Sequence, residues 1–264
     1  MSPEKDGWIA QIDPRIRQRR EQVERSRAQK RIRWALAVAG VVALVVLGVF
    51  LLHTPLFGAK VVTVTGSHPN TPTAAIVAAA GLDHRPPLID VDPGATATKV
   101  ETLPYIASAT VTRHWPDKVA ITVTERPPVV AMAGPAARWS TLDGNGRTLA
   151  VAPGRPALPV LVVHAAAGPV PPAPVGGTVA PAAAPGLLVA RTLPPAFAGQ
   201  VISVTVAGDR TVSLALTSGL TVLLGTVSDL HVKYEDVAAI IANAPLHGAH
   251  TIDVTVPQSP TVGP

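Results

Sequence analysis

The sequence predicts an α+β protein. It has one N-terminal transmembrane helix, then a β-α-α-β-β domain and a mainly antiparallel β domain with a C-terminal helix and strand. The first observation behind this prediction is a run of nineteen residues, 34–52, without an ionisable side chain. As a helix this run is about 28 Å long, close to the hydrocarbon thickness of a bilayer. The second is that short runs beyond residue 53 alternate valine and threonine, a pattern typical of strands.

The basic N-terminal tail sets the expected orientation. Residues 1–33 hold ten lysines and arginines and five acids, so their net charge is 10 − 5 = +5, the formal charge of the whole chain. Positive charge beside a span stays in the cytoplasm, which places residues 53–264 outside the membrane. The apolar run is longer than that of a signal peptide, and no A-x-A cleavage site follows it. We therefore expect an uncleaved anchor in the cell membrane.

The arginine-rich part of the tail has two interpretations. Residues 15–33 resemble a nucleic-acid-binding segment in their arginine content. However, they contain no aromatic residue for base stacking, and acids are scattered among the arginines. A role in topology, with contacts to anionic headgroups of the lipid bilayer, is therefore favoured, and no nucleic acid is expected as a partner. We expect the tail to become helical toward the membrane after about residue 13.

Composition excludes several kinds of chemistry. The chain has no cysteine, which rules out disulfides, zinc-thiolate sites and cysteine catalysis. The part beyond the span must therefore be stabilised by its hydrophobic core, and about two hundred residues are enough for one or two ordinary domains. The 28 prolines divide the chain into short elements and loops.

The region after the span predicts two helices packed on one face of a small mixed sheet. Thr71 or Thr73 could cap the first helix and Gly81 could end it, while Asp92 before a proline is a start signal for the second. Trp115 lies in the link between the last two strands, where we expect it to pack in a hairpin rather than hold a ligand. The expected order is a strand at 60–65, helices at 74–80 and near 95–102, and strands at 105–115 and 117–126.

Residues 128–257 predict the second domain. A turn at Asp143–Gly146 separates two short strands, and its D-x-N start resembles a calcium loop, but residues 149–154 supply no carboxylate ligand. The Ala/Pro-rich segment 165–185 is expected to be a loop or a mobile insertion. Three alternating runs within 201–225 then predict an antiparallel meander. The last elements are a helix with Ser228 as N-cap and an apolar face, and a strand at 250–256. The apolar face is formed by Leu230, Tyr234, Val237 and Ile241.

One segment carries a specific family resemblance. Residues Leu103 to Pro127 read LPYIASATVTRHWPDKVAITVTERP, preceded by VVTVTGS and LIDVD and followed by WSTLDGNGRTLA. This series resembles the FtsQ/DivIB family of bacterial cell-division proteins, and the first unit resembles that family's POTRA domain. The resemblance implies a cytoplasmic tail at 1–33, a transmembrane helix at 34–52, a POTRA-like domain at 58–127, a β domain at 128–257 and a tail at 258–264.

The resemblance also implies a function and a docking site. Members of the family are single-pass scaffolds of the division septum that bind FtsB and FtsL outside the membrane. They are thereby connected with septal peptidoglycan synthase components. Carried over by position, the partner-binding residues are Thr251, Ile252, Asp253, Val254, Thr255 and Val256. The family's aromatic and arginine anchors are not matched at this strand, where Thr255 and Val256 occupy their place.

The same strand has features of a docking edge. It is the last strand in the sequence and Pro257 follows it, so it can lie at the edge of its sheet. We expect Ile252, Val254 and Val256 to point inward and the two threonines with Asp253 to point outward. A partner chain could add a strand along such an edge.

The junction between the domains carries the motif Glu125-Arg126-Pro127. Glu125 and Arg126 could form a functional charge pair, or they could make the contact between the two domains at the strand end. The sequence favours neither of these interpretations.

No catalytic constellation stands out in the sequence. The eight histidines are dispersed, and His247 and His250, the close pair, lie in a loop unsuited to a rigid metal site. Asp90 and Asp92 frame a turn, where helix capping is favoured over acid/base chemistry. Nucleophile-elbow, S-x-x-K, H-E-x-x-H and P-loop motifs are lacking. We expect no enzyme activity, cofactor or metal. The alternatives are a membrane-anchored extracytoplasmic cell-wall enzyme and a POTRA-bearing secretion component.

Overall fold

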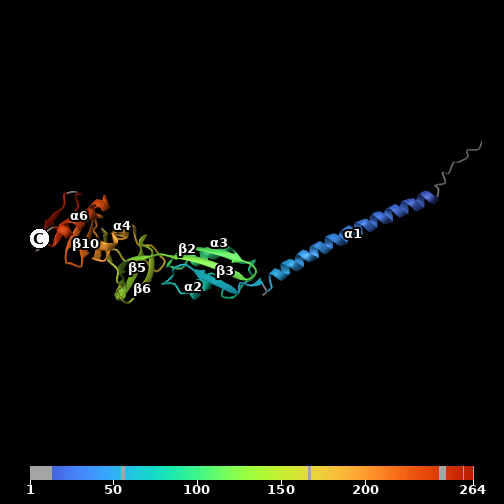
Figure 1. Cartoon of the computed structure of the whole chain (residues 1–264), viewed down its shortest axis with the longest axis horizontal. Coiled ribbons are helices and arrows are strands. Elements are labelled where there is room, and N and C mark those ends of the chain that lie inside the picture. Colours follow the sequence, from blue (N-terminus) through green and yellow to red (C-terminus); the bar gives the residue numbers. More distant parts are fainter. Residues whose placement is uncertain (1–13, 55–56, 166–167, 244–247, 258, 264) are drawn as a thin grey trace, which may run out of the picture.

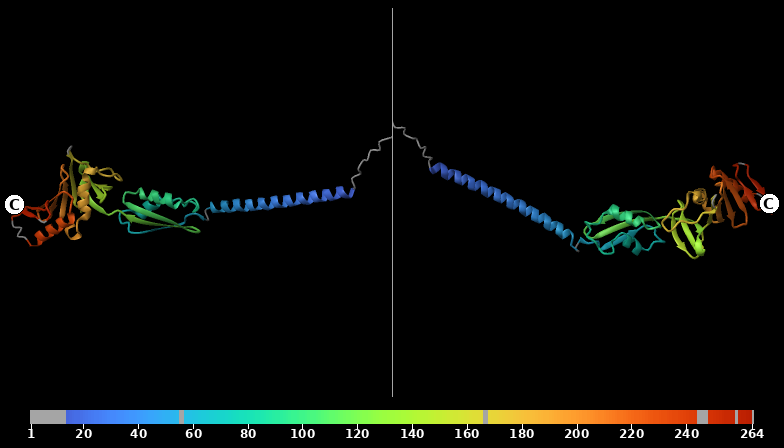
Figure 2. Two further views of the ribbon diagram at one scale, coloured as in Figure 1. Left: turned by 90° about the horizontal axis from the view of Figure 1, so that it is seen from above. Right: turned by 180° about the vertical axis from the view of Figure 1, so that it is seen from behind.

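The computed structural model describes residues 14–54, 57–165, 168–243, 248–257 and 259–263. They form a long helix, a small three-stranded domain and a larger β domain, arranged one after another (Figure 1). Two further views show the same succession, with the helix at one end of the molecule and the last strands at the other (Figure 2). The α+β fold class predicted from the sequence is confirmed.

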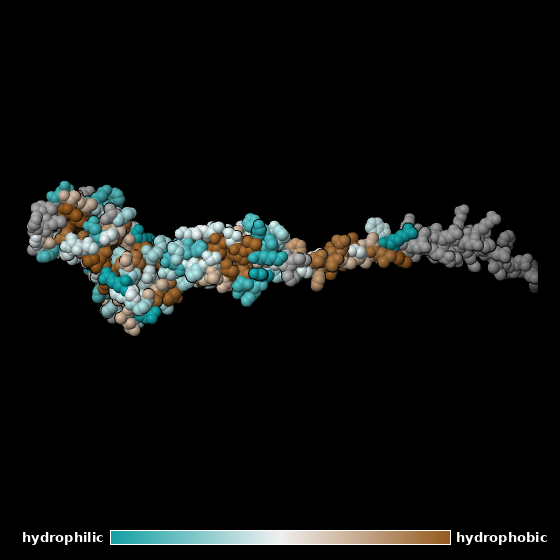
Figure 3. Space-filling view, turned by 60° about the horizontal axis from the view of Figure 1, so that its bottom comes forward, coloured by the Kyte–Doolittle hydropathy of each residue, from teal (hydrophilic) through white to brown (hydrophobic). Residues whose placement is uncertain are grey.

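Helix α1, Pro14–Leu52, is a single helix of 39 residues. Its part Arg31–Leu52 is long and apolar enough to cross a membrane, and none of it is buried against the rest of the protein. In the space-filling view hydrophobic side chains predominate along this segment (Figure 3). The predicted span at 34–52 lies inside this segment, and the helix continues into the basic tail as expected.

The small domain has the predicted order of strand, helix, helix, strand and strand. Its elements are β1 Val61–Thr65, α2 Thr73–Ala79, α3 Pro93–Glu101, β2 Ile106–His114 and β3 Lys118–Glu125. The sheet order is β1-β3-β2, with β1 parallel and β2 antiparallel to the central strand. The buried residues of β3, Val119, Ile121 and Val123, alternate with more exposed ones and share a core with Ile76 of α2 and Val100 of α3. Both helices therefore cover the same face of the sheet.

The helix ends of this domain were predicted with mixed success. Asp92 caps α3 as predicted, because its Oδ1 accepts a hydrogen bond of 3.0 Å from the amide of Ala95. Gly81 ends α2 with a φ of +70°, a conformation that glycine adopts without strain. The predicted threonine cap of α2 is wrong, because Pro72 occupies the cap position and no side chain bonds there. Trp115 is in the hairpin link and contacts the ring of Phe57 edge-on at 6.4 Å.

The larger domain is built on a ten-stranded sheet in the order β13-β12-β11-β10-β9-β7-β4-β5-β6, with β8 added to β7. Its first strands are β4 Pro128–Ala133, β5 Trp139–Asp143, β6 Thr148–Ala152, β7 Val160–Ala165 and β8 Gly168–Pro169. The later strands are β9 Val201–Val206, β10 Val212–Leu216, β11 Thr221–Gly225, β12 Thr251–Asp253 and β13 Thr261–Gly263. The antiparallel meander β9-β10-β11 is confirmed.

Helices α4, Ala184–Thr192, and α6, Leu230–Asn243, pack on this sheet together with the short α5, Pro195–Ala198. Their buried side chains form one core with the inward residues of β7, β9, β10, β11 and β12. Helix α4 approaches the sheet closely at Gly186, where an added Cβ would lie 2.5 Å from Leu161 and 2.7 Å from Val206. A side chain at this position would therefore push α4 away from the sheet.

Of the two interpretations of the Ala/Pro-rich segment, the structure supports the loop, since residues 170–180 form a loop packed on the larger domain and residues 181–185 lead into and begin α4. The backbone of Gly177 accepts a hydrogen bond of 2.9 Å from Thr148, and Val179 donates one of 2.9 Å to Gly146. Val179 is also buried in the core. This loop therefore packs against the turn between β5 and β6, and residues 166–167 of the predicted insertion lie outside the described residues.

Candidate functional site

The predicted docking strand is shorter than expected and has two neighbours. The strand expected at 250–256 is β12, Thr251–Asp253, which runs parallel to β11. Residues expected to be a tail form β13, which runs antiparallel along the other side of β12. The prediction that this strand lies at the sheet edge is therefore wrong, because β13 occupies the edge.

The predicted inward positions are confirmed at Ile252 and Val254 and are wrong at Val256. Ile252 and Val254 are fully buried, whereas Val256, predicted to point inward, is 62% exposed. The reason is a turn at Asp253, whose Oδ1 accepts a hydrogen bond of 2.8 Å from the amide of Thr255. Hydrogen bonds from the hydroxyl and the amide of Thr255 lower the pKa of the Asp253 carboxyl. This local bond competes with the sheet ladder and ends the strand.

A buried lysine next to this strand was missed by the sequence analysis. Lys233 of α6 is fully buried, and its Nζ donates hydrogen bonds of 2.8 Å to the carbonyls of Leu224 and Thr226. Burial lowers the pKa of the Lys233 ammonium. Lys233 thereby attaches α6 to the end of β11, the strand that pairs with β12. No signal in the sequence indicates this role, since an apolar helix face normally excludes lysine.

The other side chains of α6 agree better with the prediction. Tyr234 and Val237 are buried in the core, and Leu230 and Ile241 pack against it. The predicted Ser228 cap is wrong, since the helix begins at Leu230 and the Ser228 hydroxyl lies 3.1 Å from that of Thr226. Burial raises the pKa of the Tyr234 hydroxyl.

At the domain junction, Glu125 and Arg126 contact different partners. The Glu125 carboxylate accepts hydrogen bonds from the amide of Asn70, at 3.2 Å, and from its Nδ2, at 3.0 Å. These bonds stay within the small domain. Burial and the nearby charge of Glu125 raise the pKa of the Tyr105 hydroxyl. Because the Glu125 carboxylate bonds to Asn70, the interpretation of Glu125 and Arg126 as a pair with each other is wrong.

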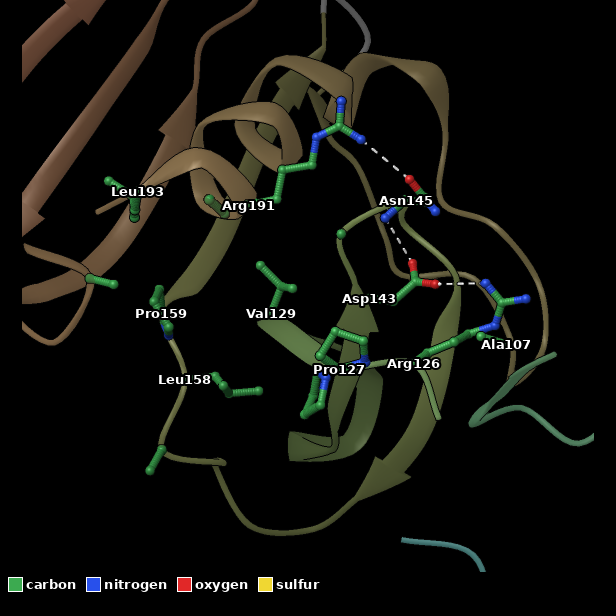
Figure 4. A pocket seen from close by; sticks show the side chains of 15 residues that line it. Ala107, Arg126, Pro127, Val129, Asp143, Asn145, Leu158, Pro159, Arg191 and Leu193 are labelled. Atoms are coloured by element: carbon green, nitrogen blue, oxygen red, sulfur yellow. Dashed lines mark hydrogen bonds and ion pairs between the residues drawn. The ribbon is translucent and has the colours of Figure 1, made fainter. Parts of the chain in front are cut away.

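Arg126 instead reaches the larger domain. Its Nη1 lies 3.4 Å from Oδ2 of Asp143, whose side chain is only 4% exposed. The other carboxylate oxygen of Asp143 accepts a hydrogen bond of 2.9 Å from the amide of Asn145 (Figure 4) and one of 2.9 Å from the amide of Arg147. Arg191 of α4 donates to the Asn145 side chain at 3.3 Å. The turn that resembles a calcium loop thus uses its aspartate to hold its own backbone and to bind the arginine of the neighbouring domain.

A cavity of about 640 Å³ lies beside this contact. Figure 4 shows the side chains around it, with Arg126, Asp143, Asn145 and Arg191 along one side. The apolar lining comes from both domains and includes Ala107, Pro127, Val129, Leu158 and Leu193. Pro127 therefore lies in the wall of the junction cavity.

The dispersed histidines do not assemble a site in the part of the chain that is described. Over these residues, no group of three or more His, Cys, Asp or Glu is placed to hold a metal ion. His250 lies just before β12, while His247 lies outside the described residues. Asp92 caps α3, and Asp90 lies 3.3 Å from His53.

Comparisons with known proteins agree with this architecture. The small domain matches the family model for the FtsQ-type POTRA domain over residues 57–126. The larger domain matches the C-terminal model of the cell division protein FtsQ/DivIB over residues 136–255. The chain belongs to the FtsQ/DivIB family. The resemblance found in the sequence is confirmed, and the family connects the chain with bacterial cell division.

Individual relatives show how far this similarity extends. The cell division protein FtsQ of Mycolicibacterium smegmatis is 32% identical over 89% of this chain and 66% of its own length. For FtsQ of Mycobacterium leprae the identity is 31%, over 82% of this chain and 59% of its own length, so the chain spans about three fifths of these relatives. FtsQ of Streptomyces bingchenggensis is 31% identical over 76% of this chain and 74% of its own length.

One solved structure is also similar. It is the major extracytoplasmic domain of the cell division protein DivIB from Geobacillus stearothermophilus. It matches 46% of this chain and 98% of that chain, with 19% sequence identity and a TM-score of 0.30.

Proposed function

We propose that the chain is a non-enzymatic scaffold of the division machinery. It binds FtsB- and FtsL-type membrane proteins outside the cell membrane and helps to assemble and regulate septal peptidoglycan synthesis. The observation that carries this proposal is the edge of the large sheet formed by β12 and the short β13 that covers it, at the end of the molecule farthest from α1 (Figure 1). Membership of the FtsQ/DivIB family supports the connection with division.

The docking site proposed on this edge comprises residues 251–256. A partner strand paired with β12 would gain backbone hydrogen bonds for affinity. Val256, exposed just beyond the strand, would supply an apolar contact at the same edge. Ile252 and Val254 have a different role, because they are buried and hold β12 on the core.

The junction motif contributes by holding the two domains together, away from the proposed docking site. Arg126 joins the end of the small domain to Asp143, and its Nε also donates to the Ile106 carbonyl at 3.2 Å. We assign Arg126 and Pro127 to holding the larger domain on the smaller one. Glu125 holds the loop of Asn70 at the same strand end.

The orientation can be tested with single cysteines, because the chain has none of its own. Val175, which is exposed in the larger domain, and Arg31, at the start of the apolar segment, are suitable positions. The Val175→Cys variant should react with a membrane-impermeant maleimide in intact cells. Arg31→Cys should react only after permeabilisation. The reverse pattern would show that the domains are cytoplasmic.

Docking can be tested by placing a photoreactive amino acid at one of two exposed valines. At Val256 it should crosslink to an FtsB-type protein in dividing cells. At Val175, a control that is also exposed and lies on the loop before α4, it should not. Crosslinks to this partner from Val175 but not from Val256 would place the docking site elsewhere. Turnover of cell-wall fragments by the purified full chain would contradict the non-enzymatic role.

A further inference from the structure

Strand β13 occupies the edge that a partner strand needs. It pairs antiparallel with all three residues of β12, so that Thr251 lies opposite Gly263, Ile252 opposite Val262 and Asp253 opposite Thr261. The amide of His250 adds a hydrogen bond of 3.0 Å to the Gly263 carbonyl. A second strand cannot use the same backbone groups of β12 while β13 is in place.

The side chains of β13 attach it only weakly. Val262 is 43% exposed and Thr261 is exposed, and β13 contributes no residue to the hydrophobic core of the domain. Pro260 directly precedes the strand and cannot donate a hydrogen bond, which limits its length. Gly263 has no side chain to pack and loses much conformational freedom in a strand.

Strand β12 is held much more firmly on its other side. Ile252 is fully buried and packs in one core with Val222 and Leu224 of the neighbouring strand β11. The amide of Val254 also donates a hydrogen bond of 3.0 Å to the carbonyl of Leu223. β12 can therefore keep its place in the sheet when β13 leaves.

We propose that β13 is a built-in placeholder that leaves β12 when a partner strand docks. This inference rests on the proposed function, because it takes β12 as the docking strand. The matching partner is an extended segment that pairs antiparallel with β12, has a β-branched or aromatic residue opposite Thr251, where β13 has Gly263, and has no proline next to the paired residues. Such a strand gains the side-chain contacts that β13 lacks and so displaces it.

Until it is displaced, β13 protects the edge. An uncovered strand edge is a template for pairing with other chains, and proteins commonly cover such edges. The partner's apparent affinity is reduced by the fraction of molecules in which β12 is free. If β13 is in place in about nine molecules of ten, its removal should strengthen binding about tenfold.

A reversible disulfide tests this proposal on the full chain. Thr251 and Gly263 lie directly opposite each other, where Cβ atoms of an antiparallel pair are about 4.5–5.5 Å apart. An added Cβ at Gly263 meets no atom within 4 Å, so a cysteine fits there. The double variant Thr251→Cys/Gly263→Cys contains no other thiol, and its disulfide fixes β13 on β12. Each single-cysteine variant, treated with the same oxidant, is a matched control.

The readout is crosslinking of an FtsB-type partner from a photoreactive residue at Val256, in membranes that contain the full chain. The oxidised double variant should lose the crosslink, and reduction should restore it. Deletion of residues 259–264 should strengthen binding about tenfold. Equal crosslinking in the oxidised and reduced states would overturn the inference while leaving the proposed function intact.

Two other outcomes also count against the proposal. Loss of binding on deletion of 259–264 would overturn it, because β13 itself would then be the strand on which the partner docks. A chain that captures no partner in any of these states would overturn the proposed function and this inference together. Hydrogen exchange gives an independent readout without a partner. The amides of β13 should exchange much faster than those of β11, and equally slow exchange would contradict the weak attachment.

Discussion

Replacement of Asp143 by alanine should strongly destabilise the larger domain. The Asp143 side chain is nearly buried and accepts hydrogen bonds of 2.9 Å from the amides of Asn145 and Arg147. Removal of the acceptor leaves two amides without partners at about 1–3 kcal/mol each, so the expected loss is about 2–6 kcal/mol. The ion pair with Arg126 should add no more than about 1 kcal/mol, because Arg126 is partly exposed.

Asp143→Asn is the informative comparison. Asparagine keeps an oxygen for the two amides and loses only the charge that attracts Arg126, so it should cost about 1 kcal/mol. Calorimetric unfolding of the full chain in detergent can separate the two variants, since 1 kcal/mol lowers the Tm of a domain of this size by about 4 °C. We therefore expect a decrease of at least roughly 8 °C for Asp143→Ala and about 4 °C for Asp143→Asn.

The control and the refuting results follow from the same contacts. Arg126→Met should be as mild as Asp143→Asn, and the double variant Arg126→Met/Asp143→Asn should be no worse than either, because one ion pair is lost in each case. An equal decrease in Tm for Asp143→Ala and Asp143→Asn would show that the charge, and not the hydrogen bonds of the turn, stabilises the junction. No decrease for Asp143→Ala would refute the reasoning entirely.

Three further substitutions should each change the stability of the protein for a different physical reason. Gly225→Ala should destabilise the domain by at least about 1–2 kcal/mol, because Gly225 has a φ of +64° and an added Cβ would lie 2.7 Å from Thr255 Cγ2; an unchanged Tm would contradict this. Asp92→Ala should cost about 1 kcal/mol through loss of the α3 cap, and Asp92→Asn, which retains an acceptor, should restore most of it in the same assay. Lys233→Met should remove a pH dependence: the pKa of Lys233 is lowered by burial, so the folded state releases its proton at a lower pH than the unfolded chain. Relative to Lys233→Met, the unmodified chain should therefore lose stability as the pH falls from 10.5, the ordinary pKa of lysine, through the lowered pKa of Lys233. Stability profiles of the two proteins that run parallel over this pH range would contradict the prediction.

Local sequence patterns were sufficient to predict most of the fold. The uncharged run 34–52, the alternation around Ile121 and the Asp92-Pro93 start signal each depend on neighbouring residues, and each element formed as expected. The meander within 201–225 could be predicted from the sequence for the same reason. The family resemblance agreed with these patterns, because its most specific segment is the β2–β3 hairpin.

The candidate site was less predictable because it depends on contacts distant in sequence. The strand at 250–256 has an ideal alternating pattern, but the carboxylate of Asp253 bonds to Thr255 and ends it early. Lys233 shows no sign of burial until the carbonyls at the end of β11 are placed beside it. The pairing of β13 with β12 involves a glycine and a valine flanked by prolines, a composition that indicates a tail. The ion pair between Arg126 and Asp143 joins two domains and forms only when both are folded.

The end-to-end arrangement of the molecule sets a minimum reach for a partner that docks on β12 as proposed. β12 lies in the larger domain, at the end of the molecule opposite α1 (Figures 1 and 2). With α1 in the bilayer, a protein rooted in the same membrane must extend past the combined length of the two domains before its strand meets β12. A helical stalk gains about 1.5 Å per residue and an extended one about 3.3 Å. Shortening that stalk by a few turns would therefore abolish docking although every contacting residue is retained.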